Sequence, residues 1–183
     1  RARSLALGVS PASVCHLAWA QVLARASGRE DVVFGTVLFG RMQGGSGADR
    51  VLGLFINTLP VRLRVGDAGV QDSVRHTHAL LGQLLRHEHA PLALAQRCSA
   101  VAAPTPLFSA LLNYRHSAAE ARVHAEALQA RDGIESLGFE ERTNYPLTLD
   151  VDDLGEGFAL EVQVQSPIDP QRVCAFMHTA LEQ

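Results

Sequence analysis

Residues 31–39 read DVVFGTVLF, a nearly continuous run of β-branched and aromatic side chains. The run lacks the apolar and polar alternation of a half-exposed strand, so it predicts a central strand that is covered on both faces. Gly40 and Arg41 follow it directly, and the glycine-rich residues 44–47 then predict a loop. We therefore expect a buried strand with a loop at its carboxyl end.

The sequence on either side of this strand predicts two helices and a second strand. Before it, Ser10-Pro11 opens a helix that Gly28 ends, because serine caps free N–H groups, proline suits the first helical position and glycine suits the stop. After it, residues 55–65 predict a strand in which Pro60 marks a bulge or a sheet edge. Apolar residues at helical spacing predict a helix over residues 70–87.

The remaining segments complete an interleaved order of helices and strands. We expect a short helix over residues 92–97, a buried strand over 108–114, and a loop with a turn of helix over 117–133. Two strands joined by the turn-rich residues 152–157 predict an antiparallel pair, and Pro170 opens a last helix. This order predicts the α/β or α+β class, with a mixed β-sheet flanked by helices.

The composition indicates one domain and excludes several kinds of function. The 183 residues carry a formal net charge of −3, which argues against a nucleic-acid module. All 16 basic residues are arginine, so catalysis by lysine is excluded. No apolar run approaches the roughly 18 residues of a membrane span. Three distant cysteines, Cys15, Cys98 and Cys174, predict reduced and mostly buried thiols in a cytoplasmic protein.

No pattern of catalytic or metal-binding residues stands out. His76 and His78 are two residues apart, which places them on different faces of the predicted helix. Residues 87–89, His-Glu-His, predict surface side chains near a helix end, and no HExxH or Cys/His cluster occurs, so we expect no metal site. Residues 45–47, Gly-Ser-Gly, lack the spacing of a nucleophile elbow. We therefore assign no catalytic residue.

Two stretches place polar residues where apolar ones are expected. Gly40 and Arg41 follow the buried strand, and Asn57 and Thr58 lie inside an apolar strand, with Arg62 a few residues further on. Buried polar groups need hydrogen-bond partners. A strand end that presents them could face a cavity or a domain interface. A hydrogen-bond network that fixes the register of the strands explains the same residues.

Residues 52–62 read LGLFINTLPVR. This stretch and four others resemble the condensation domains of nonribosomal peptide synthetases, and it closely matches the family motif GxFxNTxxxR. The other passages are individually weaker, and residues 87–92, HEHAPL, depart from the common form HQDxPFE of the family. All five occur in the order of the family and extend over nearly the whole chain: residues 30–41, 52–62, 87–92, 106–114 and 144–147.

The resemblance implies a fold and a reaction. Family members have two lobes, each similar to chloramphenicol acetyltransferase, that meet along a tunnel. Carrier proteins deliver thioester-bound substrates on phosphopantetheine arms, and the acceptor amine attacks the donor thioester. The catalytic motif His-His-x-x-x-Asp-Gly lies in the N-terminal lobe, and no adjacent histidine pair occurs here. Residues 1–183 thus resemble the C-terminal lobe, cut from a longer protein and inactive alone.

The resemblance also assigns residues and partners. Gly40, Arg41, Asn57 and Thr58 are expected near the lobe interface or the tunnel, and Arg62 as a structural anchor. The expected partners are the N-terminal lobe, donor and acceptor peptidyl carrier proteins, and an adjacent adenylation domain, with no nucleic acid and no membrane. No cofactor is expected to bind directly, since the phosphopantetheine arm belongs to the carriers.

Two alternative functions and one solution property complete these expectations. The lobe of an epimerization domain, or of a dual epimerization and condensation domain, shares the same architecture. A non-catalytic lobe that only docks carrier proteins is an alternative of another class. In either case an isolated lobe exposes the apolar strip that normally faces its partner, so we expect self-association.

Overall fold

The computed structural model describes residues 1–41, 47, 51–116 and 142–182. The segment predicted over residues 117–133 and most of the glycine-rich loop lie outside these residues. Five strands form one sheet in the order β2-β1-β3-β4-β5. Their bounds are β1 Asp31–Leu38, β2 Asn57–Arg64, β3 Ala110–His116, β4 Leu147–Asp153 and β5 Phe158–Val164.

The sheet is mixed, as the sequence predicts. Strands β1, β3 and β4 are parallel to one another. The two outer strands are antiparallel: β2 pairs with β1, and β5 pairs with β4. The carboxyl ends of β1, β3 and β4 therefore share one edge, which we call the carboxyl edge. Strand β2 begins there, because Asn57 pairs with Leu38.

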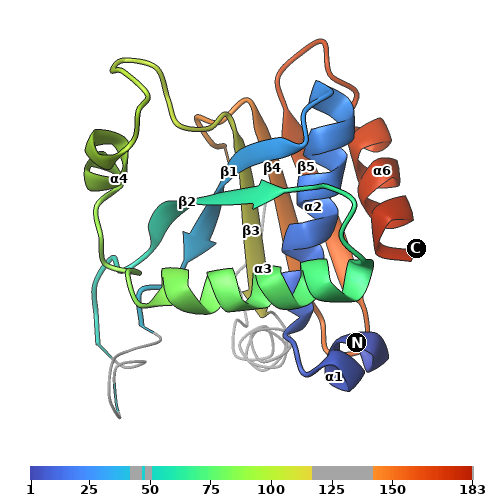
Figure 1. Cartoon of the computed structure of the whole chain (residues 1–183). Helices are drawn as coiled ribbons and strands as arrows, with labels where there is room; N and C mark the ends of the chain where they lie inside the picture. The colour runs from blue at the N-terminus through green and yellow to red at the C-terminus, as the bar shows by residue number, and fades with distance from the viewer. Residues whose placement is uncertain (42–46, 48–50, 117–141, 183) are drawn as a thin grey trace, which may run out of the picture.

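A layer of helices covers one face of the sheet, the covered face. Figure 1 shows α2 (Pro11–Ser27) between α3 (Val70–Leu85) and α6 (Pro170–Glu182), and the contacts between α2 and both neighbours agree. Helix α4 (Leu92–Cys98) stands apart and contacts β2 at the edge of the sheet. On the opposite face, the open face, stacked Phe108 and Tyr145 rings lie with their centroids 5.5 Å apart.

Helix α2 has the ends that the sequence predicts. Ser10 lies at the N-cap and accepts a hydrogen bond from the Ser13 amide, Pro11 opens the helix, and Gly28 ends it with a φ of 67°. Helix α1 (Ala2–Leu7) was not predicted, because its six residues carry no capping side chain and are too few to show a period.

The core lies between the covered face and the helices. Alternate residues of each strand point to it, as Val32 and Phe34 do on β1. Buried side chains from four strands, β1 to β4, and from two helices, α2 and α6, pack there out of contact with water. The largest hydrophobic ones are Trp19, Phe34, Leu112, Leu149 and Met177.

Two sequence expectations about burial hold only in part. On β1, Val32 and Phe34 of the covered face are buried, whereas Val33 and Val37 of the open face are half-buried. The cysteines are not mostly buried, since Cys15 is buried, Cys174 is half-buried and Cys98 is exposed.

Two other features of the described chain bear on the sequence expectations. Pro60 does lie on an edge strand, where its missing N–H leaves no gap in the sheet. No helix in the described part of the chain combines the length and the apolar character that crossing a membrane requires.

Candidate functional site

Asn57 joins two sequence-distant segments at the carboxyl edge. Its Nδ2 donates hydrogen bonds to the carbonyl oxygens of Glu88, at 2.8 Å, and Ala90, at 2.7 Å. Its Oδ1 accepts a hydrogen bond from the Thr58 amide at 2.9 Å. One side chain therefore holds the start of β2 against the turn that follows α3. These are two of the segments that the sequence analysis compared with family motifs.

Gly40 and Arg41 pack against the chain that leads into β2. Gly40 has a φ of 66°, and a Cβ atom there would lie 2.0 Å from the carbonyl oxygen of Phe55, so only glycine fits. The Arg41 guanidinium lies 5.0 Å from the centroid of the Phe55 ring, and its Nη2 donates to the Gly53 carbonyl at 3.4 Å. The carboxyl edge thus brings Gly40 and Arg41 together with Asn57 and Thr58.

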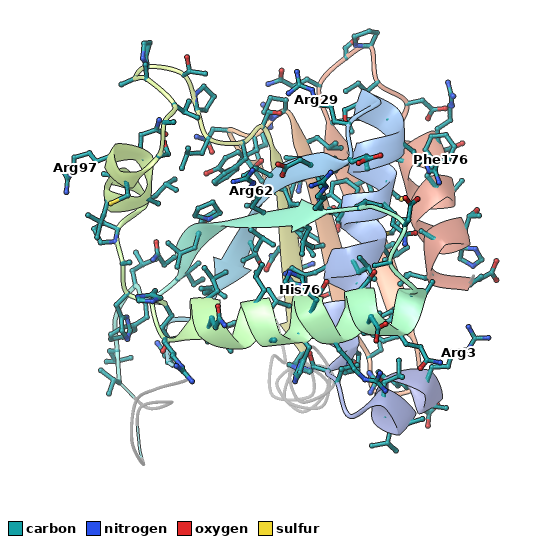
Figure 2. All side chains as sticks on the ribbon, in the orientation of Figure 1. Arg3, Arg29, Arg62, His76, Arg97 and Phe176 are labelled. Carbon is teal, nitrogen blue, oxygen red and sulfur yellow. The ribbon has the colours of Figure 1, made fainter. Side chains whose placement is uncertain are left out.

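Arg62 does not belong to this group. It lies five residues along β2 from Asn57, about 17 Å at the usual rise of a strand. Its guanidinium donates from Nε to both carboxylate oxygens of Asp31, at 3.0 and 3.2 Å, and from Nη2 to Oδ2 at 2.6 Å. This contact lowers the pKa of Asp31. Figure 2 shows Arg62 at the end of the sheet where Arg29 also lies, and both line one open cavity.

Glu88 is a buried residue that the sequence reasoning missed. It is 1% exposed, whereas His87 and His89 on either side are exposed. Its Oε1 lies 3.7 Å from Nε2 of His89. Nothing in the local sequence marks it, because a carboxylate between two histidines at a helix end is typical of a solvated surface.

Apolar side chains surround the carboxyl edge on the solvent side. They come from the residue after β1 and from the segment that leads into β2. Contiguous exposed apolar side chains indicate an interaction surface rather than free solvent. They are Phe39, Val51, Leu52, Leu54 and Ile56, of which Leu52 is 97% and Leu54 95% exposed.

A cavity of about 290 Å³ opens on the open face beside this surface. We call it the open-face cavity. Its apolar wall consists of four side chains, and Val37 among them pairs with Thr58 across the strands. The apolar wall residues are Val37, Phe39, Ile56 and Leu111, and the polar lining residues are Asn113, Arg115, Thr143, Thr148 and Asp150.

A polar ladder between β3 and β4 forms the floor of the open-face cavity. Asn113 Nδ2 donates to Oδ1 of Asp150 at 2.8 Å, and Arg115 donates from Nε and Nη2 to Asp152 at 2.8 and 2.9 Å. Arg115 Nη1 also lies 3.8 Å from Asp150 Oδ1. Asn113 faces Asp150, and Arg115 faces Asp152, in the register of the two strands. The sequence shows the acidic residues but not their partners on another strand.

His16 is a buried titratable group on the covered face. Burial lowers its pKa to about 4, against the opposing effect of a hydrogen bond to the Ala12 carbonyl. Nδ1 donates to that carbonyl at 2.7 Å, so Nε2 accepts from the Thr36 hydroxyl at 2.8 Å. This neutral side chain ties α2 to β1 and lies away from the open face.

A second buried polar group lies at the carboxyl end of β4. The Tyr114 hydroxyl donates to Oδ2 of Asp153 at 2.5 Å. Burial, with a smaller contribution from Cys15, raises the pKa of Tyr114 to about 12. Among the residues that the structure describes, no three histidine, cysteine or carboxylate side chains gather as metal ligands would.

Known proteins are similar to this chain in sequence. The family profile described as "Condensation domain" matches residues 5–180. Malpinin synthetase of Mortierella alpina is 53% identical over 182 residues, which cover 100% of this chain and 2% of that protein. Malpibaldin synthetase of the same organism is 56% identical over 176 residues, with 96% and 3% covered. Nonribosomal peptide synthetase vlms of Lecanicillium sp is 29% identical over 164 residues, with 88% and 2% covered.

Solved structures share the fold at low sequence identity. The condensation domain of the monacolin K polyketide synthase has a TM-score of 0.72 at 23% identity, and the match covers 100% of this chain and 42% of that one. A holo four-domain nonribosomal peptide synthetase has a TM-score of 0.70 at 15% identity, with 96% and 15% covered. The chain spans only 2–3% of the length of its sequence relatives. With the profile match over residues 5–180, these findings show that the chain belongs to the condensation domain family.

Proposed function

We propose that this chain is the C-terminal lobe of a nonribosomal peptide synthetase condensation domain and helps to form amide bonds between carrier-bound substrates. The observation that carries the proposal is the match of the condensation domain profile over residues 5–180. The structural match to less than half of a complete condensation domain supports the assignment to one lobe.

The reaction that we propose is an acyl transfer. The acceptor amine nitrogen attacks the thioester carbonyl carbon, the C–N bond forms and the C–S bond breaks. The nitrogen loses a proton and the departing thiolate gains one, which leaves an amide and a free thiol. Holding two tethered reactants together makes this step effectively unimolecular. Since this chain has no adjacent histidine pair, we assign the proton-accepting group to the N-terminal lobe.

The carboxyl edge is our proposed contribution to the substrate tunnel and the lobe interface. Gly40, Arg41, Asn57 and Thr58 gather there beside the exposed apolar side chains, which would become buried against a second lobe. Arg62 anchors β2 to β1 at the other end through Asp31. The lobe holds no cofactor of its own, and phosphopantetheine arms of donor and acceptor carriers, next to an adenylation domain, bring the substrates.

A reconstitution tests the proposal. Amide formation is measured with aminoacyl- and peptidyl-loaded carrier proteins, first with this chain alone and then with this chain preceded by its natural upstream segment. We expect product only from the longer protein. Product from these 183 residues alone would place the catalytic group within this chain and overturn the lobe assignment. Carrier binding without product from the longer protein would favour a non-catalytic docking lobe.

Substitution of Asn57 tests the role of the carboxyl edge. In the longer protein, Asn57→Ala removes both hydrogen bonds to the turn after α3, and we expect turnover to fall at least tenfold while the protein stays folded. Gln96→Ala is the matched control, because the Gln96 amide also donates to two backbone carbonyls, those of Val101 and Thr105, away from this edge. Unchanged turnover in Asn57→Ala would remove the tunnel assignment, and an unfolded variant would favour the role in strand register.

The epimerization alternatives rest on one sequence feature. Residues 87–89, which Asn57 binds through Glu88, depart from the common family form. The configuration of the donor residue in the amide product distinguishes a simple condensation domain from a dual epimerization and condensation domain. Retention of the loaded configuration supports a simple condensation lobe, and inversion supports a dual domain.

A further inference from the structure

The open-face cavity lies directly beside the residues that we place at the tunnel. Val37 in its wall pairs with Thr58, and Phe39 directly after β1 and Ile56 directly before β2 flank the carboxyl edge. Its remaining lining comes from β3, from β4 and from the residues just before β4. Three strands and the segments next to them therefore build the cavity, which makes it a feature of the fold rather than of one loop.

The size and wall of the open-face cavity suit an apolar group. Its volume is about 290 Å³, and an apolar cavity of roughly 150 Å³ already accommodates benzene. Val37, Leu111 and Ile56 supply aliphatic surface, and Phe39 supplies an aromatic ring that is 47% exposed. A branched aliphatic or aromatic side chain thus has both room and partners.

The floor of the cavity argues against a charged guest. The Asp150 carboxylate is engaged by Asn113 and Arg115, and Asp152 is engaged by two donors of Arg115. A charged group that entered would lose water while its possible counter-charges are already paired. A neutral side chain incurs no such desolvation cost.

We propose that the open-face cavity receives a branched aliphatic or aromatic side chain of a carrier-bound amino acid, and so selects which substrate is used. This inference rests on the proposed amide-forming function. Selection then occurs at the side chain of the substrate, away from the reacting thioester. Val37 and Phe39 are the specificity-determining residues, because they line the cavity without taking part in the polar ladder.

The test uses the protein with its natural upstream segment and carriers loaded with phenylalanine, leucine or alanine, varied first on the donor and then on the acceptor. Val37→Phe fills the cavity. We expect the kcat/KM for phenylalanine and leucine to fall at least tenfold relative to alanine, on one of the two carriers. Val33→Phe is the matched control, since Val33 lies on the same face of β1 but does not line this cavity, and it should keep the wild-type ratio.

Phe39→Ala is the second variant, and it widens the cavity at a side chain that is already half-exposed. We expect it to raise the kcat/KM for tryptophan relative to phenylalanine about threefold or more. If Val37→Phe does not fold, the tryptophan to phenylalanine ratio of Phe39→Ala tests the proposal alone. A ratio equal to that of the wild-type protein overturns the proposal.

The outcomes separate this inference from the proposed function. A folded Val37→Phe protein with unchanged ratios, or with equal losses for all substrates, overturns the cavity proposal while amide formation still supports the function. A wild-type protein that forms no amide with any loaded pair overturns the proposed function itself.

Discussion

The two faces of the sheet are built from the same strands but differ in burial and polarity. On β3, Leu112 points into a dry core against the helices, whereas Leu111 and Asn113 on either side of it line the open-face cavity. The covered face is mostly apolar and buried, and the open face combines half-buried valines with a charged ladder. This difference is consistent with the division that we propose, with stability mainly on one face and substrate recognition on the other.

The largest expected effect tests this division with two matched leucines. Leu112→Ala should lower the free energy of unfolding by about 3 to 4 kcal/mol, because it leaves a cavity in a core that cannot collapse. Leu111→Ala should lower it by about half as much, since its side chain already borders a cavity. Urea denaturation measures both. Equal losses would show that the open face carries as much of the stability as the covered face.

The next effect concerns His16 on the covered face. Its folded pKa of about 4 lies below the unfolded value near 6.5, so the unfolded chain binds more protons between these values. Stability is therefore complete above pH 6.5 and decreases by about 3 kcal/mol as the pH falls to 4. His16→Gln should flatten this dependence in urea titrations between pH 7 and 4. His76→Gln, at an exposed site, serves as the control, and parallel profiles for all three proteins would contradict the assignment to His16.

Two glycines with the same backbone angle test how tightly the carboxyl edge is packed. Gly8 and Gly40 both have a φ of 66°, but only Gly40 would place a Cβ atom against the Phe55 carbonyl. Gly8→Ala should cost about 1 kcal/mol from backbone strain alone. Gly40→Ala should cost about 2 kcal/mol or more because Phe55 must also move, and it should reduce amide formation. Denaturation and the reconstituted assay measure the two effects, and equal costs would argue against close packing at this edge.

The smallest expected effect concerns Arg62, at the opposite end of the open face. Arg62→Gln removes its exposed ion pair with Asp31, and exposed pairs contribute little to stability. We expect an unchanged unfolding midpoint but faster amide hydrogen exchange at the amino end of β1. A clear fall in the midpoint would make Arg62 a global anchor rather than a local one.

Much of the fold could be predicted because its signals are local. Ser10, Pro11 and Gly28 mark the ends of α2, and the mixed sheet follows from the order of the elements. The prediction was less accurate for β1, whose β-branched residues continue onto a face where Val33 and Val37 are only half-buried. Apolar side chains on that face are as consistent with a binding surface as with a buried core, and the sequence pattern does not distinguish the two.

Part of the candidate site could also be predicted, since Asn57 and Thr58 interrupt an apolar strand. The hydrogen-bond partners of Asn57 could not be predicted. The carbonyl groups that Asn57 binds belong to residues 88 and 90, and every residue has such groups. The burial of Glu88 likewise has no local cause, because it depends on how the turn after α3 meets β2.

The sequence by itself determined most of the described elements, their order and the family, because helix caps, strand patterns and motif spacing act over a few residues. Only the tertiary structure decided which polar residues meet. Asn113 and Asp150 are 37 positions apart, and the register of β3 against β4 makes them neighbours. Strand register is set by side chains from the whole sheet, so the floor of the open-face cavity exists only once the strands have paired.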